Sequence, residues 1–196
     1  MIQRVMKKKN AKFVREQGGG NMTWLAKYFA IAAHEAAGQV RKYSGEPYWT
    51  HPVAVAQNVA PFVSDEGVEA AYLHDVLEDT NISEATLRQF FSPLTVDYVV
   101  GLTKISKSED GPRAVRKAKD LAFLAKQCAE VQTIKCADIE HNVLDIIKAD
   151  PGFARTYLPE KAALLAVLTK AHPIMRNRAL AAVNKGLEYL ENQDPQ

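Results

Sequence analysis

The chain has few of the features that mark extracellular or membrane proteins. It contains two cysteines, Cys128 and Cys136, among 196 residues, and neither has a partner at zinc-finger spacing. This pattern favours reduced thiols in a cytosolic protein rather than a disulfide framework or a structural metal cluster. Charged residues break the apolar runs well before the roughly 20 residues that a membrane span needs, and the N-terminus has no apolar signal core. We therefore expect a soluble, cytoplasmic protein without a membrane partner.

An excess of one charge is also lacking. Lys and Arg number 25 against 23 for Asp and Glu, so the bulk charge does not indicate a nucleic-acid partner. No segment alternates convincingly between apolar and polar residues, and nothing repeats at a fixed period, so neither a sheet nor a solenoid is predicted. The apolar content of 47% suffices for one well-buried core. We expect a single all-α domain over residues 23–192, preceded by a flexible basic and glycine-rich arm over 1–22.

Apolar residues recur at helical spacing through most of the chain. Prolines at first-turn positions predict helix starts at Pro52 and Pro93. The apolar stripe of the helix over 24–42 is expected to include Val40, and that of the helix over 131–148 is expected to include Leu144. The expected helices cover residues 24–42, 52–63, 68–78, 84–91, 93–102, 131–148, 159–171 and 173–190, and one more ends near Lys126.

One helix in this set carries an unusual group of polar side chains. If residues 68–78 are helical, His74 and Glu78 lie four residues apart on one side, as do Asp75 and Asp79. Three acids and an imidazole among bulky apolar residues are unfavourable unless they are paired or bind a cation. The adjacent His-Asp pair suits a divalent ion with mixed nitrogen and oxygen ligands, and the later acids can handle a proton or a water.

Two further segments offer additional ligands. His51 precedes a proline at a helix start, and Asp138 lies four residues before Asn142 in the middle of another predicted helix. Each has an ordinary explanation by itself, since a lone His before Pro is often a turn or cap residue and a helical Asp is usually solvated. Their joint appearance with His74 and Asp75 favours a metal site.

This arrangement resembles the HD-domain metal phosphohydrolases, in which two histidines and two aspartates hold one divalent ion in an all-helical bundle. Five motifs in order resemble, more specifically, the small alarmone hydrolases and the hydrolase domain of the bifunctional stringent-response proteins. These motifs are His34-x-x-x-Gly38-Gln39-x-Arg41-Lys42, Gly45-x-Pro47-Tyr48-x-x-His51-Pro52, Leu73-His74-Asp75-x-x-Glu78-Asp79-Thr80, Leu102-Thr103-Lys104 and Lys135-x-Ala137-Asp138-x-x-x-Asn142. The resemblance spans residues 23–168 and includes no alarmone-synthetase domain.

The resemblance implies roles for the matching positions. His51, His74, Asp75 and Asp138 would bind a metal, which is manganese in this family, and Glu78 and Asp79 match the catalytic acid pair. Arg41 matches a position that stacks on the base. The expected substrate-binding residues are Arg41, Lys42, Ser44, Thr103, Lys104, Asn142 and Arg113. Arg113, with Arg116, could bind a diphosphate or simply form a solvated basic helix face. We interpret His34 as a residue that supports the ligands or packs against them rather than as a fifth ligand, and His141 and His172 as exposed or structural.

Two enzymatic functions and one non-enzymatic function follow from these residues. The first is a manganese-dependent hydrolase that removes the 3′-diphosphate from ppGpp or ppApp as pyrophosphate. The second keeps the metal and the water but acts on NADPH or another 2′- or 3′-phosphorylated nucleotide. A nucleotide-binding module without catalysis is disfavoured because both acids of the catalytic pair are present. The sequence leaves the base preference and the oligomeric state open, a homo-oligomer included.

Overall fold

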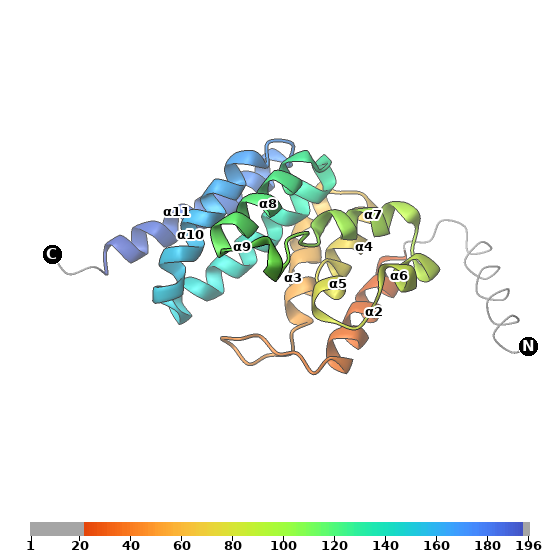
Figure 1. Cartoon of the computed structure of the whole chain (residues 1–196). Coiled ribbons are helices and arrows are strands. Elements are labelled where there is room, and N and C mark those ends of the chain that lie inside the picture. The colour runs from red at the N-terminus through yellow and green to blue at the C-terminus, as the bar shows by residue number, and fades with distance from the viewer. Residues whose placement is uncertain (1–21, 194–196) are drawn as a thin grey trace, which may run out of the picture.

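The computed structural model describes residues 22–193, so the arm expected over 1–22 lies outside the described residues except for Met22. The described part is helical and contains no strand, which confirms the all-α prediction (Figure 1). The helices are α2 (Thr23–Ala36), α3 (Thr50–Val59), η1 (Ala60–Phe62), α4 (Asp65–Leu73), α5 (Val76–Asp79), α6 (Glu84–Phe90), α7 (Pro93–Leu102), η2 (Ser108–Asp110), α8 (Arg113–Lys126), α9 (Ala129–Ala149), α10 (Pro151–Val167) and α11 (Pro173–Glu191).

The long helix α9 joins the two halves of the bundle. In Figure 1, α8 to α11 occupy one half and α2 with α4 to α7 the other, with α3 between them. Helix α9 packs against α11 and α10 on one side and against α3, α4 and α7 on the other. Side chains on α9 can therefore meet side chains from α3 and from the end of α4.

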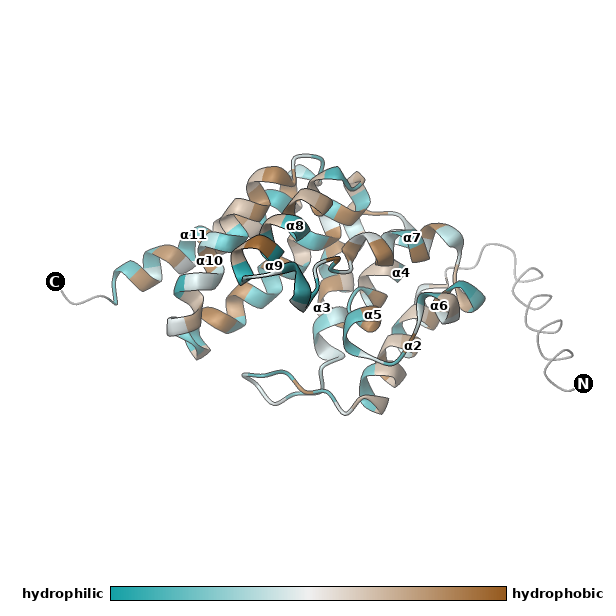
Figure 2. Cartoon of the chain, viewed as in Figure 1, coloured by the Kyte–Doolittle hydropathy of each residue, from teal (hydrophilic) through white to brown (hydrophobic). Residues whose placement is uncertain are grey.

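The core follows the helical period. Val131, Ile134, Ala137 and Val143 of α9 are fully buried or nearly so, while Leu144 is 59% exposed. The prediction that Leu144 belongs to the apolar stripe is wrong, because each residue turns the helix by about 100° and Val143 already occupies that stripe. Figure 2 shows the resulting mixture of apolar and hydrophilic residues on most helices. Among the described helices, none is both long and apolar enough to cross a membrane.

The first helix is shorter than predicted. Helix α2 ends at Ala36 rather than Lys42, and residues 37–49 form a loop that reverses direction. Gly38 and Gly45 take φ values of 65° and 72°, a backbone conformation that favours glycine and ends the helical pattern. A bridge pairs Val40 with Pro47. Val40 is 60% exposed, so its expected place in an apolar stripe is also wrong.

The predicted helix over residues 68–78 is two helices. Helix α4 ends at Leu73 and the short α5 begins at Val76, which leaves His74 and Asp75 at the junction. His74 Nδ1 lies 2.8 Å from the carbonyl oxygen of Ala71, one of the acceptors that the end of a helix leaves open. The break turns both side chains inward without requiring a continuous helical face.

The C-terminal half contains one further difference. Helix α10 begins at Pro151, not at Pro159, which lies inside it. The Asp150 carboxylate accepts a hydrogen bond from the Phe153 N–H at 3.0 Å, so the predicted break at Asp150-Pro151-Gly152 is the N-terminal cap of this helix. The predicted starts at Glu84, Pro93 and Pro173 are confirmed.

We predict that Gly67→Ala destabilises the protein. Gly67 lies in the first turn of α4, and an added Cβ would stand 2.8 Å from Val63 Cβ, closer than such atoms approach. The crowding should lower the free energy of unfolding by about 1–3 kcal/mol in urea titrations. Gly152→Ala is the matched control, because it also lies in a first turn and its Cβ would meet nothing closer than 3.8 Å. Equal stability of the two variants would contradict the close packing of α4.

Candidate metal centre and active site

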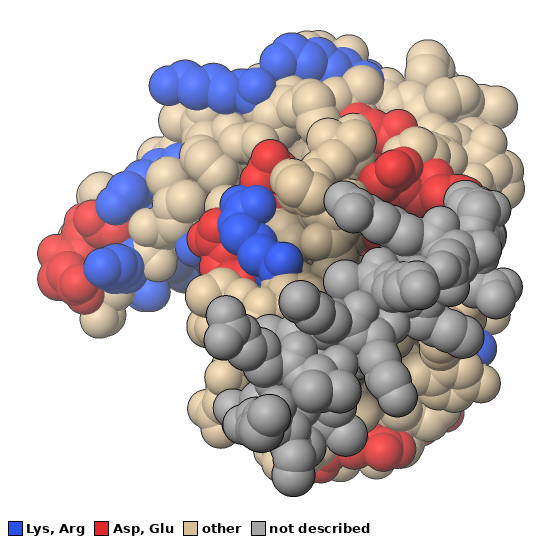
Figure 3. Space-filling view, turned by 90° about the vertical axis from the view of Figure 1, so that its right-hand side faces the viewer, with Lys and Arg blue, Asp and Glu red and all other residues tan. Residues whose placement is uncertain are grey.

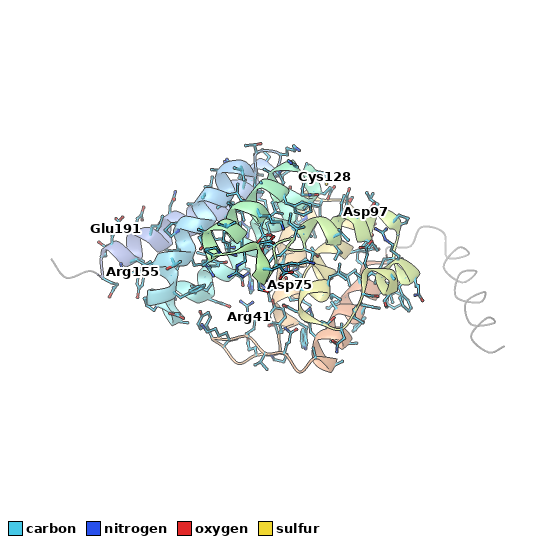
Figure 4. The ribbon with its side chains drawn as sticks, in the orientation of Figure 1. Arg41, Asp75, Asp97, Cys128, Arg155 and Glu191 are labelled. Carbon is cyan, nitrogen blue, oxygen red and sulfur yellow. The ribbon has the colours of Figure 1, made fainter. Side chains whose placement is uncertain are left out.

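Three helices bring together the two predicted histidines and one predicted aspartate. His51 is the second residue of α3, His74 directly follows α4, and Asp138 lies in the middle of α9. All three are buried, and one potential ligand atom of each lies within 4.8 Å of the others. Asp75, the fourth predicted ligand, adjoins this group from the α4–α5 junction. Figure 4 shows Asp75 near the middle of the molecule, where the two halves meet.

The facing atoms are two imidazole nitrogens and two carboxylate oxygens. His51 Nε2 lies 3.1 Å from Asp138 Oδ1 and 3.6 Å from Asp75 Oδ2. His74 Nε2 lies 3.1 Å from Asp75 Oδ2 and 3.8 Å from Asp138 Oδ1. Both Nε2 atoms are buried and have no hydrogen-bond partner within the described residues. Unpartnered nitrogen atoms beside buried carboxylates form a donor set that suits a divalent cation.

The charges at this centre are strongly coupled. Burial raises the pKa of Asp138, but the Lys135 ammonium and the neighbouring imidazoles outweigh burial and hold the pKa well below its usual range. For Asp75, too, burial raises the pKa, and His74 more than reverses that effect. Burial lowers the pKa of His74, whereas Asp75 and Asp138 raise it, to about 10. Both carboxylates are therefore ionised at neutral pH and attract positive charge.

Neighbouring groups orient each of these ligand side chains. Lys135 Nζ lies 2.8 Å from Asp138 Oδ2, and Asn142 Nδ2 donates to Asp138 Oδ1 at 2.6 Å. The Tyr48 hydroxyl donates to Asp75 Oδ2 at 2.7 Å. On the far side of its ring, His51 Nδ1 lies 3.0 Å from Nδ1 of His141.

These residues fit a metal of the hard-to-borderline class. Mixed imidazole and carboxylate ligands suit first-row divalent ions, whereas soft thiolate ligands are absent from this group of described residues. His51, His74, Asp138 and the adjacent Asp75 are the side chains that would hold such an ion. The partners of these ligands match the support that metal-binding residues usually receive from a second layer of hydrogen bonds.

The two predicted catalytic acids lie on α5, directly after the metal centre. Glu78 accepts a hydrogen bond from the Lys104 backbone N–H at 2.7 Å and forms an ion pair with the Lys104 ammonium. Burial, Asp75 and Glu78 together raise the pKa of Asp79. An acid with a raised pKa next to a metal centre is suited to accept a proton from water.

The predicted base-side residues lie on the 37–49 loop, which contacts α9. Arg41 is buried, donates to Asn142 Oδ1 at 3.2 Å and forms an ion pair with Asp145. Its guanidinium lies 6.0 Å from the centre of the Tyr48 ring. In Figure 4, Arg41 lies below Asp75, near the centre of the view. The structure thus brings Arg41 and Asn142 to the metal centre.

Two predicted residues of this loop lie further out. Lys42 pairs with the Asp150 carboxylate at 3.2 Å and has an exposed side chain. The Ser44 hydroxyl is 3.3 Å from Glu46 Oε2. Neither residue has a described contact with the metal centre, and their substrate roles stay predictions.

A cavity of about 350 Å³ opens between α8, α9 and α10. Four lysines line it: Lys104, Lys117, Lys135 and Lys161. Two of these lysines also contact the active-site acids, since Lys104 pairs with Glu78 and Lys135 with Asp138. Thr103 also lines this cavity, and its role in substrate binding stays a prediction. The cavity therefore extends the metal centre with positive charge that a phosphate group can use.

Arg113 does not line the cavity, whereas Lys161, to which the sequence analysis gave no role, does. Arg113 donates to both carboxylate oxygens of Glu160, at 2.7 and 2.8 Å, and does not line the cavity. Lys161 follows Glu160 and lies over the Tyr157 ring, with Nζ 4.7 Å from its centre. Burial and the nearby Lys135 ammonium lower the pKa of Lys161 to about 7. Sequence reasoning missed Lys161, whose only signal is the run Pro159-Glu160-Lys161 at the side of a long helix.

The histidines outside the predicted ligand set have separate environments. His34 is buried in α2 and packs on Tyr48, with ring centres 4.9 Å apart. His172 packs on Phe62 at 4.7 Å. His141 contacts a predicted metal ligand, which the reading of this residue as exposed or structural did not anticipate. Tyr48 is the other residue that we did not assign, although it stands in the Gly45-x-Pro47-Tyr48 motif.

Comparison with known families assigns the class of this all-helical, metal-centred fold. The profile of the HD domain matches residues 26–149, more than half of the chain. The chain belongs to the HD domain family.

The relatives narrow the class further. The chain is 35% identical over 148 residues to a probable guanosine-3′,5′-bis(diphosphate) 3′-pyrophosphohydrolase of Synechocystis; the match covers 74% of this chain and 20% of that protein. A guanosine-3′,5′-bis(diphosphate) 3′-pyrophosphohydrolase of Haemophilus influenzae is 34% identical over 165 residues, 82% of this chain and 22% of its own length. The chain thus spans about a fifth of these curated relatives.

A solved structure shares the fold over most of both chains. It is described as a metazoan ortholog of SpoT that hydrolyzes ppGpp, and it superposes with a TM-score of 0.73. The match covers 83% of this chain and 94% of the other, at 22% identity. At that identity, the similarity shows the HD-type helical fold.

We predict that Mn²⁺ stabilises the protein through this centre. A cation that binds only the folded state should raise the free energy of unfolding by about 2.7 kcal/mol at a concentration 100 times its Kd. Asp138→Asn should lose most of this gain, because it removes one ligand charge. Asp97→Asn is the matched control, since the Asp97 side chain is 61% exposed and pairs with Arg88. Thermal unfolding with and without Mn²⁺ measures the effect, and an equal gain in both variants would contradict the site.

Proposed function

We propose that this protein is a manganese-dependent hydrolase that removes the 3′-diphosphate from ppGpp or ppApp and releases pyrophosphate. The observation that carries the proposal is the pair of unpartnered Nε2 atoms of His51 and His74 beside two carboxylates. The acids Glu78 and Asp79 and the lysine-lined cavity adjoin this centre. The activity in the names of the relatives supports the same reaction.

Each part of the centre has a distinct task in this reaction. When bound, a divalent cation supplies Lewis-acid chemistry, which makes water more acidic and offsets the charge of phosphoryl oxygens. Asp79, whose pKa is raised, takes a proton from the attacking water. Glu78 is held by the Lys104 backbone N–H on one oxygen, and its ion pair with the Lys104 side chain occupies the other. These two contacts fix the orientation of the Glu78 carboxylate.

The bond changes balance as a simple hydrolysis. The water oxygen forms a bond to the phosphorus that is attached to the ribose 3′-oxygen, and the bond between that phosphorus and the 3′-oxygen breaks. One proton of the water passes to a carboxylate of the acid pair, and the ribose oxygen takes up a proton. The products are pyrophosphate and a nucleotide with a free 3′-hydroxyl.

The two ends of the substrate have different partners in this proposal. Arg41, positioned by Asn142 and Asp145, offers its planar guanidinium to the base. Lys104 and Lys161 offer ammonium groups to phosphate oxygens from the cavity between α8 and α10. On the part of the face that Figure 3 shows in colour, both acidic and basic side chains are present.

The decisive experiment gives the purified protein Mn²⁺ with ppGpp, ppApp or NADPH and separates the products by anion exchange. We expect pyrophosphate from at least one of the two alarmones. Glu78→Gln should lower kcat on the order of 10²- to 10⁴-fold, because it removes the charge of one member of the acid pair while nearly keeping the shape of the side chain. Glu84→Gln is the control, since Glu84 is exposed and pairs with Arg88 on α6.

The outcomes of this experiment separate the functions. Pyrophosphate that disappears in the Glu78 variant alone supports the proposed reaction and reveals the base preference. Orthophosphate from NADPH, without reaction of either alarmone, would replace the proposal with a nucleotide phosphatase. No product from any of the three compounds, while Mn²⁺ is bound, would refute both enzymatic readings for these substrates.

We also predict that substrate binding weakens as pH rises through about 7. Lys161 has a lowered pKa of about 7, so its ammonium is present below that pH and is lost above it. Only the charged form attracts phosphate, and KM should rise by about tenfold between pH 6.5 and pH 8.5. Lys161→Arg keeps its charge over this range and should lack this component of the pH profile. Parallel profiles for the parent and the Arg variant would contradict the role of Lys161.

A further inference from the structure

His141 contacts His51 on the side of the imidazole ring that faces away from the metal centre. It lies on α9, three residues after Asp138, so the two side chains lie on the same side of the helix one turn apart. Its Nδ1 is 3.0 Å from Nδ1 of His51, and the two ring centres are 4.9 Å apart. His141 is not one of the three residues whose ligand atoms converge. Its described hydrogen-bond contact is with the outer nitrogen of His51.

The contact between the two Nδ1 atoms constrains where the protons lie. Two ring nitrogens 3.0 Å apart form a hydrogen bond only when one of them carries a proton and the other accepts it. His51 must keep Nε2 unprotonated to bind a cation, so its single proton lies on Nδ1. His51 is therefore the donor, and Nδ1 of His141 is the acceptor.

The tautomer of His74, the other histidine of the metal centre, is fixed by the backbone. Its Nδ1 faces the carbonyl oxygen of Ala71 at 2.8 Å, and a carbonyl can only accept. The backbone thus fixes the tautomer of His74 with Nε2 free. His51 has no backbone carbonyl in that role, because its described outer partner is the His141 ring. The His141 ring thus occupies the position next to His51 Nδ1 that the Ala71 carbonyl occupies next to His74 Nδ1.

We propose that His141 is a positioning residue that keeps the proton of His51 on Nδ1 and directs the Nε2 lone pair toward the cation. The alternative is that the His141 ring only fills space between α3 and α9. A space-filling role needs the volume of the ring, whereas a positioning role needs an acceptor at one point. These two requirements can be separated by substitution.

Three variants test the two roles in the full-length protein. His141→Asn places its amide oxygen near the position of Nδ1 and keeps the acceptor. His141→Gln carries the oxygen one bond further out and offers it near the position of Nε2 instead. His141→Leu keeps bulk and removes the acceptor. His172→Leu is the matched control, because this half-buried histidine packs on Phe62 away from the metal centre.

The readout is the affinity for Mn²⁺ alone, measured by titration calorimetry without nucleotide. Loss of an outer partner of a metal-binding histidine typically weakens binding by about 10- to 100-fold, and we expect this loss in His141→Leu and His141→Gln. His141→Asn and His172→Leu should bind like the parent. In the zinc-loaded protein, ¹H–¹⁵N correlation spectra should show the His51 proton on Nδ1 in the parent and the Asn variant.

The outcomes also separate this inference from the function on which its metal site rests. Unchanged affinity in His141→Leu, or equal losses in the Asn and Gln variants, would overturn the positioning role. If His141→Leu does not fold, the Asn and Gln pair still decides between the two roles. Absence of Mn²⁺ binding by the parent would instead refute the proposed metal centre. Absence of alarmone hydrolysis would leave the affinity comparison intact.

Discussion

Asp138 and Asp75 place two negative charges in the interior of a helical bundle, at the point where α3, α4 and α9 meet. Buried carboxylates this close are tolerated only when positive charge or hydrogen bonds compensate them. Lys135, Asn142 and Tyr48 supply part of that compensation. Lys135 pairs with Asp138 Oδ2, whereas Asn142 and Tyr48 donate to Asp138 Oδ1 and Asp75 Oδ2, the oxygens that also face the histidines. The inner edges of His51 and His74 remain without partners. These compensating side chains come from α9 and from the 37–49 loop, so both segments are held against the same concentration of charge.

Much of this centre could be predicted from the sequence because its ligands stand in short motifs. His51 before Pro52 marks a helix start, and the adjacent pair His74-Asp75 is conspicuous among apolar residues. The all-α class followed from helical spacing, and the starts of α6, α7 and α11 followed from serine or proline at those positions. Helix ends were harder to predict. Apolar residues continue past Ala36 and through His74, and only the left-handed glycines and a side-chain contact to the Ala71 carbonyl end those helices.

The features that were missed depend on contacts between distant segments. Nothing in the local sequence of Lys161 indicates that Lys135 lies close enough to lower its pKa. His141 looks like an ordinary polar residue of α9 until α3 brings His51 against it. Arg113 seemed available for phosphate because it begins a basic helix, but α10 presents Glu160 to it. Such pairings depend on how α8, α9 and α10 pack, which a single sequence does not specify.

The origin of the ligands in three separate helices has a consequence for folding. His51 and Asp138 are far apart along the chain, and the segment between them contains α4 to α8. An ion bound by both residues joins the two ends of that segment into a closed loop. Such a loop lowers the conformational entropy of the unfolded chain, as a covalent cross-link does. Both cysteines are free thiols, so no disulfide does this within the described residues. The cation would act as a removable cross-link, one that a chelator opens without any change in the redox state of the protein.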